Sequence, residues 1–224
     1  MTFNNLGLPQ SLLELLNKEN YKSAYPIQKE AIPIVLKGKD VLGIAQTGSG
    51  KTASYVLPIL SALNHKQRAK DRQVDVLVLV PTRELAEQVK DVFNLFEKGI
   101  SNTVKTMAIY GGVSINPQMK ALFGVSVLVA TPGRLLDLVN SNAVHFDKLQ
   151  TLVLDEADKL LNLGFQDEMN QIFALLPKKR QNLLFSATLN EKVEEINQIL
   201  LRDPELINVA PKEKNLDQIR QLAY

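Results

Sequence analysis

Short apolar runs rich in β-branched residues recur along this chain and alternate with segments of helical spacing. The apolar runs span residues 40–45, 74–80, 104–110, 125–130, 149–154, 182–187 and 205–209. Several of them contain no polar alternation, as in the sequence Val-Leu-Val-Leu-Val at 76–80, which predicts parallel strands buried on both faces. Helical spacing occurs at 12–16, 84–96, 165–176 and 193–201. The alternation predicts an α/β fold with a doubly wound, mostly parallel sheet.

Length and composition favour one large domain. The chain has 224 residues, of which 45% are apolar and 22% are charged, so it has enough apolar sequence for a packed core. We expect this domain to span 1–209. The remaining segment, 210–224, contains Pro211 and several charges and is interpreted as the start of a linker. The polar segment 64–73 is interpreted as a surface connection.

Composition also argues against several classes of site. The absence of cysteine excludes a disulfide scaffold and a Cys-based zinc site, and it fits a reducing cytoplasm. The two histidines, His65 and His145, lie far apart in sequence, so no imidazole metal site is expected. No secretory signal and no apolar stretch of about 18 residues is visible, so we expect a cytoplasmic protein without a membrane partner. The net charge of +2 means that any surface for nucleic acid must be local.

A glycine-rich loop lies between a predicted strand and a predicted helix. Its residues are Ala45, Gln46, Thr47, Gly48, Ser49, Gly50, Lys51 and Thr52. Glycines at positions 48 and 50 permit a tight loop whose N–H groups point at phosphate oxygens, and the helix adds its positive end. In such a P-loop Lys51 reaches the β- and γ-phosphates and Thr52 places a hydroxyl on Mg²⁺. The alternative is a glycine-rich turn before a surface lysine.

Three acids follow the apolar run that ends at residue 154. Ligands of open α/β sheets bind outside the carboxyl ends of the strands, so Asp155 is expected to face the P-loop and hold Mg²⁺, partly through water. Glu156 is the candidate to orient or activate the attacking water. Asp158 lies further from the phosphates. The alternative is ordinary acid enrichment at a helix N-terminus.

The sequence Asp-Glu-Ala-Asp at 155–158, together with the P-loop, resembles the DEAD-box ATP-dependent RNA helicases. The resemblance continues, in the family's order, through 81–85 (Pro-Thr-Arg-Glu-Leu), 111–112 (Gly-Gly), 131–134 (Thr-Pro-Gly-Arg) and 186–188 (Ser-Ala-Thr). It covers nearly the whole chain. The resemblance implies the first, N-terminal RecA-like domain of such a helicase, with ATP and Mg²⁺ as its cofactors.

An upstream segment, within residues 1–29, is similar to the family's Q motif. The resemblance implies that Gln28 reads the adenine edge with its amide and that Tyr21 stacks on the adenine ring, which would select ATP. Tyr25 stands where a small hydroxyl residue is usual. Phe3 is similar to the family's isolated upstream aromatic. The alternative for Gln28 is a surface glutamine on a helix that begins at a proline.

Three further motifs each follow a predicted strand, and the resemblance implies that they hold the sugar-phosphate backbone of one RNA strand. Their residues are Pro81, Thr82, Arg83, Gly111, Gly112, Thr131, Pro132, Gly133 and Arg134. The alternative is helix caps and turns. The resemblance also implies that Ser186 and Thr188 bond to the acidic motif, including Asp158, and couple hydrolysis to strand separation. The basic run 178–180 is interpreted as a solvated turn and not as an RNA site.

The family's working enzyme has two similar domains, and the later motifs are not found in this sequence. We therefore expect a first domain that binds ATP or ADP, hydrolyses ATP very slowly alone, and unwinds RNA duplexes when joined to a second RecA-like domain. Two alternatives remain open at this point. One is a DNA-directed P-loop translocase, and the other is a non-catalytic, nucleotide-dependent docking module.

Overall fold

The computed structural model describes residues 2–64, 66, 71–101 and 103–209. The predicted linker at 210–224, and part of the predicted connection at 64–73 including His65, lie outside these residues. Among the described residues, no helix is both long and apolar enough to cross a membrane.

The centre of the molecule is a parallel sheet whose strands match the seven apolar runs. The strands are β1 (Val41–Ile44), β2 (Val76–Leu79), β3 (Thr106–Ile109), β4 (Val127–Ala130), β5 (Thr151–Leu154), β6 (Gln181–Ser186) and β7 (Glu205–Asn208). They are ordered β3-β4-β2-β5-β6-β1-β7, and each neighbouring pair runs parallel. The predicted doubly wound α/β fold is confirmed.

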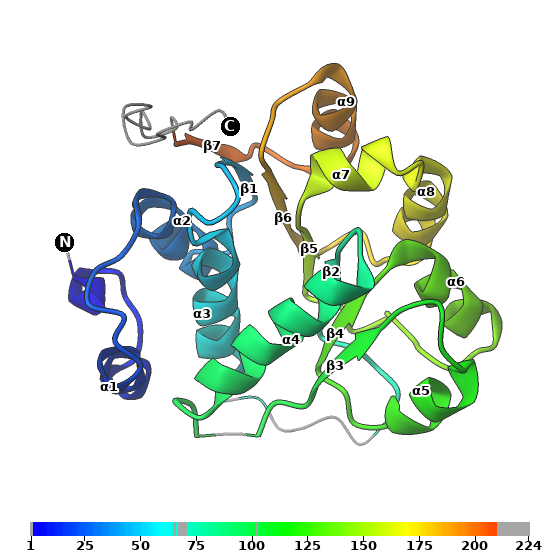
Figure 1. Ribbon diagram of the computed structural model, residues 1–224, viewed down its shortest axis with the longest axis horizontal. Helices are drawn as coiled ribbons and strands as arrows, with labels where there is room; N and C mark the ends of the chain where they lie inside the picture. The colour runs from blue at the N-terminus through cyan, green and yellow to red at the C-terminus, as the bar shows by residue number, and fades with distance from the viewer. Residues whose placement is uncertain (1, 65, 67–70, 102, 210–224) are drawn as a thin grey trace, which may run out of the picture.

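Helices cover both faces of the sheet (Figure 1). One face carries α1 (Gln10–Lys18), α2 (Pro26–Leu36), α3 (Lys51–Leu63) and α4 (Arg83–Glu97). The other face carries α5 (Ile115–Ala121), α6 (Pro132–Asn140), α7 (Ala157–Asn162), α8 (Gln166–Leu175) and α9 (Glu191–Leu200). The four segments of helical spacing lie within α1 and along α4, α8 and α9, as predicted. A short 3-10 helix, Phe3–Asn5, precedes them and buries Phe3 in the core.

The apolar runs are explained by burial on both faces. In β2, Val76 and Val78 pack with the helices α1–α4, whereas Leu77 and Leu79 pack with the helices of the opposite face. All four side chains are at most 2% exposed. Since neither face of the strand meets water, neither needs a polar residue, and the alternation typical of a half-buried strand is lost.

A phenylalanine of β6 packs over the glycine at the centre of β1, and α3 packs on that phenylalanine. A Cβ atom on Gly43 would lie 2.6 Å from Cδ1 of Phe185 in β6, so the phenyl ring occupies the space above the glycine. Tyr55 of α3 packs on the same ring, with 5.4 Å between ring centroids. This packing fixes α3, and therefore its first residues at the P-loop, against the sheet.

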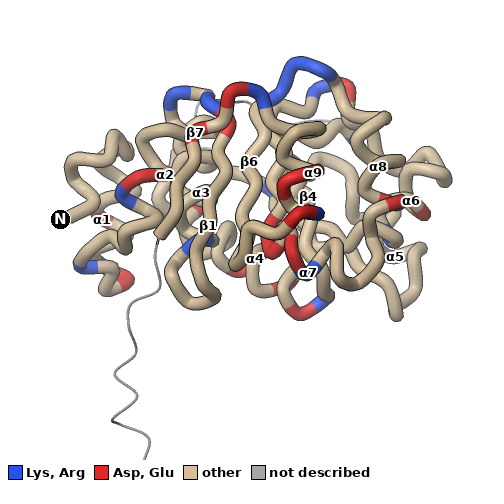
Figure 2. Tube along the Cα trace, turned by 90° about the horizontal axis from the view of Figure 1, so that it is seen from above, with Lys and Arg blue, Asp and Glu red and all other residues tan. Residues whose placement is uncertain are grey.

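The amino ends of the strands carry a separate polar cluster. The carboxylate of Asp40 is buried and accepts hydrogen bonds from the backbone N–H groups of Asn182, at 2.7 Å, and Arg202, at 2.9 Å. The basic run 178–180 lies in the turn between α8 and β6 on this same side, and its two lysines are exposed. Figure 2 shows Lys and Arg segments gathered at this edge, whereas acidic segments surround α7 and α9.

Candidate nucleotide and nucleic-acid site

The predicted motifs meet along one edge of the sheet, where the parallel strands end. In spatial order, the motif residues follow β3 (111–112), β4 (131–134), β2 (81–83), β5 (155–158), β6 (186–188) and β1 (45–52). The acidic motif and the 186–188 motif therefore lie between the three loops predicted to hold RNA and the P-loop. Ligands of open parallel sheets bind at this edge, so the topology brings both predicted surfaces together.

The P-loop has the backbone that phosphate binding requires. Gly48 and Gly50 have φ angles of 82° and 86°, in the left-handed region that other residues enter at a cost. Helix α3 begins at Lys51, so its free N–H groups and positive dipole end face the loop. The Oγ atom of Ser49 is buried without a hydrogen-bond partner, which suits a site that a phosphate oxygen fills.

Lys51 lines a hollow between the P-loop and the acidic motif. This hollow has a volume of about 320 Å³ and is lined by Thr47, Gly48, Gly50, Lys51, Thr52, Leu85, Gln88, Asp155 and Glu156. The Nζ atom of Lys51 donates a hydrogen bond to the carbonyl oxygen of Ala45 at 2.7 Å. A lysine held by a single neutral acceptor can turn toward a stronger anionic one, so a phosphate can recruit it.

Asp155 is held on both of its carboxylate oxygens and is only 2% exposed. Its Oδ1 accepts from the backbone N–H of Glu156 at 2.9 Å, and its Oδ2 accepts from the hydroxyl of Tyr55 at 2.8 Å. Burial raises the pKa of Asp155, while the hydrogen bond from Tyr55 and the charge of Lys51 oppose this rise. Burial and the charge of Asp155 raise the pKa of Tyr55 well above its usual value. The Tyr55 hydroxyl therefore stays protonated and acts as the donor of the hydrogen bond to Asp155.

Glu156 has an unusual backbone for a non-glycine residue, with φ 54° and ψ 50°. Its carboxylate forms an ion pair with Nζ of Lys159 at 2.8 Å, and this pair raises the pKa of Lys159. Left-handed conformations of non-glycine residues cost on the order of 1 kcal/mol and concentrate at functional sites. The strained geometry therefore agrees with a chemical role for Glu156.

The residues present fit a magnesium ion that arrives with a nucleotide. Among the described residues, no group of three or more His, Cys, Asp or Glu side chains could hold a metal alone. The hollow does bring together the hydroxyl of Thr52 and the carboxylate of Asp155, both hard oxygen donors. Mg²⁺ is commonly bound by one or two protein oxygens together with substrate phosphates and waters, which is the set that this edge can complete.

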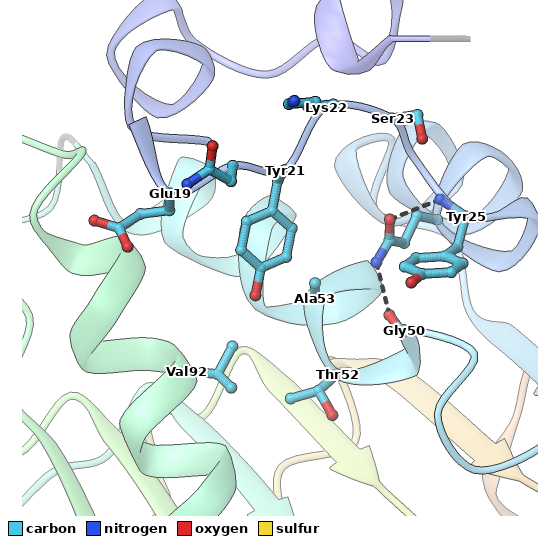
Figure 3. A pocket seen from close by; sticks show the side chains of 11 residues that line it. Glu19, Tyr21, Lys22, Ser23, Tyr25, Gly50, Thr52, Ala53 and Val92 are labelled. Carbon is cyan, nitrogen blue, oxygen red and sulfur yellow. Dashed lines mark hydrogen bonds between the residues drawn. The ribbon is translucent and has the colours of Figure 1, made fainter. Parts of the chain in front are cut away.

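A second hollow lies beside the first, between the predicted adenine residues and α3. Its volume is about 570 Å³, and Tyr21, Tyr25, Gln28, Ala53 and Val92 are among its lining residues. Figure 3 shows Tyr21 projecting between Ala53 and Val92. The Tyr21 ring also makes an edge contact with Phe96, with 5.3 Å between centroids, which holds it at the wall of the hollow. That Tyr21 stacks on adenine stays a prediction, and the hollow beside the tyrosine ring offers space for a base.

Gln28 makes contacts that the sequence did not predict. Its Oε1 accepts from the backbone N–H of Tyr25 at 2.9 Å, and its Nε2 donates to the carbonyl oxygen of Gly50 at 3.0 Å (Figure 3). The side chain is only 1% exposed, so the alternative of a surface glutamine is wrong. An amide has two donor hydrogens and two acceptor lone pairs, so one of each remains for an adenine edge. Gln28 thus links this second hollow to the P-loop.

The residues predicted to hold RNA differ in their exposure. Four are exposed, namely Thr82, Arg83, Gly111 and Gly112, whereas Gly133 and Arg134 are half-buried and Pro81, Thr131 and Pro132 are buried. Thr82 and Arg83 are exposed at the start of α4, where the Thr82 hydroxyl accepts from the N–H of Leu85 at 3.2 Å. One guanidinium nitrogen of Arg134 donates to the carbonyl oxygen of Val113 at 2.9 Å, and another is buried without a partner. Arg134 therefore joins the loop after β4 to the Gly111–Gly112 loop after β3.

The 186–188 motif contacts the last acid of the acidic motif. The Ser186 hydroxyl oxygen accepts from the backbone N–H of Asp158 at 3.3 Å, and the Thr188 hydroxyl donates to Oδ2 of Asp158 at 3.0 Å. The following helix, α9, is capped instead by Asn190, whose side chain accepts from the N–H of Val193. The hydroxyls are thus bonded to the acidic motif as expected, and the coupling role stays a prediction.

Several residues of the site were not found from the sequence. Tyr55 bonds to Asp155, and Leu85 and Gln88 line the hollow beside the P-loop. For Tyr55 a signal did exist, because it lies one helical turn after Lys51 and is therefore on the same side of the helix as the lysine. For Gln88 no local pattern distinguishes it from an ordinary exposed residue of α4.

Comparison with known proteins decides the family. A sequence model of the family described as DEAD/DEAH box helicase matches residues 25–196. The chain belongs to the DEAD/DEAH box helicase family. Its fold also matches the crystal structure of a DEAD box protein from the hyperthermophile Methanococcus jannaschii, with a TM-score of 0.85 and 33% identity over 93% of this chain and 56% of that one. The predicted membership and the RecA-like fold are confirmed.

Curated DEAD-box relatives align over essentially the whole chain. The DEAD-box ATP-dependent RNA helicase CshA of Streptococcus pneumoniae is 43% identical over 222 residues, which are 99% of this chain and 41% of that protein. The DEAD-box ATP-dependent RNA helicase RhpA of Helicobacter pylori is 40% identical over 224 residues, which are 100% of this chain and 44% of that protein. The chain therefore spans less than half the length of these relatives. The relatives are named as ATP-dependent RNA helicases.

Proposed function

We propose that this DEAD-box chain is the ATP-binding domain of an ATP-dependent RNA helicase. The observation that carries the proposal is the order of motifs along the carboxyl edge of the sheet. The P-loop lies at one end and the three loops assigned to RNA lie at the other, with the acidic motif and 186–188 between them. A nucleotide and a nucleic-acid backbone bound at this edge would share one set of central residues.

At the nucleotide end, the chain's own residues bind and orient the triphosphate. Lys51 and the loop N–H groups would hold the phosphates, while Thr52 and Asp155 would hold Mg²⁺. When bound, the ion would neutralise charge that develops on the phosphate oxygens. Glu156 would orient the attacking water, and its strained backbone supports that assignment.

Adenine selection is assigned to Tyr21 and Gln28. The hollow beside them has room for a purine, and Gln28 retains a free donor and a free acceptor. Because the same amide holds the carbonyl of Gly50, a base that engages Gln28 would be sensed directly at the P-loop. The proposal therefore favours ATP over GTP.

RNA is assigned to the loops that contain Thr82, Arg83, Gly112 and Arg134. The exposed hydroxyl of Thr82 and the exposed guanidinium of Arg83 suit phosphate oxygens, and the exposed glycines after β3 permit close approach of the backbone. Such contacts carry little base specificity, so the proposed partner is RNA of any sequence. ATP and RNA occur together in the cytoplasm, where the proposal places the protein.

The proposed enzyme also needs a second RecA-like domain, as the resemblance to the helicase family implies. An arginine finger supplied by another domain is typically worth 10³–10⁵ in rate, so the chain alone is expected to turn ATP over slowly. With the second domain present, closure around ATP and RNA would separate a short duplex locally.

The experiment compares ATP turnover by a protein that contains both domains, with and without single-stranded RNA, against the same protein with Lys51→Ala. We expect turnover that RNA stimulates and that Lys51→Ala abolishes. A DNA oligonucleotide of matched sequence serves as competitor. Equal stimulation by DNA would instead indicate a DNA-directed translocase, and no turnover with either would indicate a docking module.

A further inference from the structure

One buried hydroxyl beside the phosphate site is not explained by the roles assigned so far. Tyr55 lies in the second turn of α3, one helical turn after Lys51, and is completely buried. Its hydroxyl donates to Oδ2 of Asp155 at 2.8 Å, across 100 residues of sequence. A buried tyrosine needs a partner for its hydroxyl, but packing alone would have been satisfied by a phenylalanine on the same ring contact with Phe185.

The hydroxyl completes the fixation of the Asp155 carboxylate. Oδ1 already accepts from the backbone N–H of Glu156, which holds that oxygen from the strand end. Without a hydrogen-bond partner on Oδ2, the Asp155 carboxylate could rotate about its Cβ–Cγ bond within the buried site. The nearby cation is Lys51, whose charge already acts on Asp155. A carboxylate turned toward Lys51 would draw that ammonium away from phosphate and would itself be turned away from a metal.

We propose that Tyr55 is a positioning residue that aims Asp155 at the magnesium ion of a bound nucleotide and keeps it apart from Lys51. The inference rests on the proposed function, because it assumes that Asp155 and Thr52 hold the ion. Tyr55 itself touches neither phosphate nor metal in this account. It acts through Asp155, so its loss weakens the use of Mg²⁺ more than the binding of the nucleotide itself.

Partners that orient metal ligands typically change metal affinity by about 10–100-fold when they are removed. Tyr55→Phe keeps the ring and its packing on Phe185 and removes only the oxygen. We expect the Mg²⁺ concentration for half-maximal binding of a fluorescent ADP analogue to rise by about 10–100-fold in this variant. The affinity for the same analogue in EDTA, where Asp155 has no ion to hold, is expected to stay within about twofold of the wild type.

A matched control is available in a pair formed by α4 and the residue that follows β3. The hydroxyl of Tyr110 donates to a carboxylate oxygen of Glu87, also at 2.8 Å, but this pair lies outside the phosphate hollow. Tyr110→Phe removes the same kind of bond, so it is expected to leave the magnesium midpoint unchanged. Thermal melts of both variants report whether either loses its fold.

A second measurement needs no variant. The chain has five tyrosines, and with ¹³C-labelled tyrosine the Tyr55 resonance can be assigned through its contact with Phe185. In the ADP complex, titration with MgCl₂ is expected to shift the ζ-carbon of Tyr55 with the same midpoint as the fluorescence.

The outcomes separate the two levels of the argument. No effect of Mg²⁺ on ADP binding by the wild type would contradict the proposed roles of Asp155 and Thr52. A clear magnesium effect in the wild type with the same midpoint in Tyr55→Phe would overturn the inference about Tyr55 alone. If Tyr55→Phe does not fold, an unmoved Tyr55 resonance in the wild-type titration would overturn it equally.

Discussion

The two left-handed glycines of the P-loop give a matched pair of substitutions. Gly48 and Gly50 have nearly the same φ, 82° and 86°, so alanine would carry a similar backbone cost at either position. Their surroundings differ. A Cβ atom on Gly48 would meet nothing within 4 Å, whereas one on Gly50 would lie 2.5 Å from Nε2 of Gln28 and 2.9 Å from Cδ2 of Tyr25.

The expected magnitudes follow from these contacts. Gly48→Ala should cost about 1–2 kcal/mol of unfolding free energy, which is the left-handed penalty. Gly50→Ala should lower the unfolding free energy by about 2 kcal/mol more than Gly48→Ala does. Overpacking typically costs about 1–3 kcal/mol, and the hydrogen bond that would be lost contributes about 1 kcal/mol. Gln28 is a flexible side chain, but it is only 1% exposed and both ends of its amide are bonded. Moving it aside therefore breaks its bond to Gly50 and disturbs its bond to Tyr25.

The assay is urea unfolding followed by circular dichroism, since the chain contains no tryptophan. Repeating both substitutions in a Gln28→Ala background tests the cause, because the extra cost at Gly50 should shrink once the amide is gone. Equal costs at the two glycines, or an extra cost that survives Gln28→Ala unchanged, would refute the link between Gln28 and the P-loop.

Three further predictions concern other parts of the edge and the sheet. Gly43→Ala should lower the unfolding free energy by about 1–3 kcal/mol in urea, because its Cβ would collide with Phe185; a neutral result would contradict the close packing of β6 against β1. Thr82→Ala removes the side-chain cap of α4 and should lower the unfolding free energy by about 1 kcal/mol in urea. Thr82→Ser keeps the hydroxyl and should retain most of the wild-type stability, and a serine variant as unstable as the alanine variant would argue against the hydrogen bond to Leu85. Glu156→Gln in a two-domain protein should preserve ATP-dependent RNA binding while turnover falls by about 10²–10⁴, and unchanged turnover would exclude the role assigned to Glu156.

Much of the fold could be predicted because its signals are local. A strand such as β2 is buried on both faces, so its run of apolar residues is continuous and visible without any partner. The P-loop is equally local, since two glycines, a lysine and a hydroxyl residue follow one another between a strand and a helix. The order of the strands is not local, and it was the structure that placed the acidic motif between the P-loop and the RNA loops.

The parts of the site that could not be predicted depend on contacts between distant segments. Gln28 bonds to Gly50 because α2 packs against α3, and Tyr55 meets Asp155 while its ring packs on Phe185 of β6. Neither contact leaves a periodic signal in the sequence. The resemblance to the family predicted that Gln28 binds adenine, but the hydrogen bond from Gln28 to Gly50 of the P-loop became visible only in the structure.

The most direct test of the account is whether the P-loop binds nucleotide through its lysine. Binding of a fluorescent ADP analogue with Mg²⁺ would be compared for the wild type, Lys51→Ala and Lys39→Ala. Lys39 pairs with Glu205 at the opposite edge of the sheet, so its variant removes the same charge at a distance. The account predicts equal affinity for the wild type and Lys39→Ala, and affinity at least about tenfold weaker for Lys51→Ala, because a hydrogen bond to a charged group is worth about 1.5–3 kcal/mol. Equal affinity in all three proteins would contradict it.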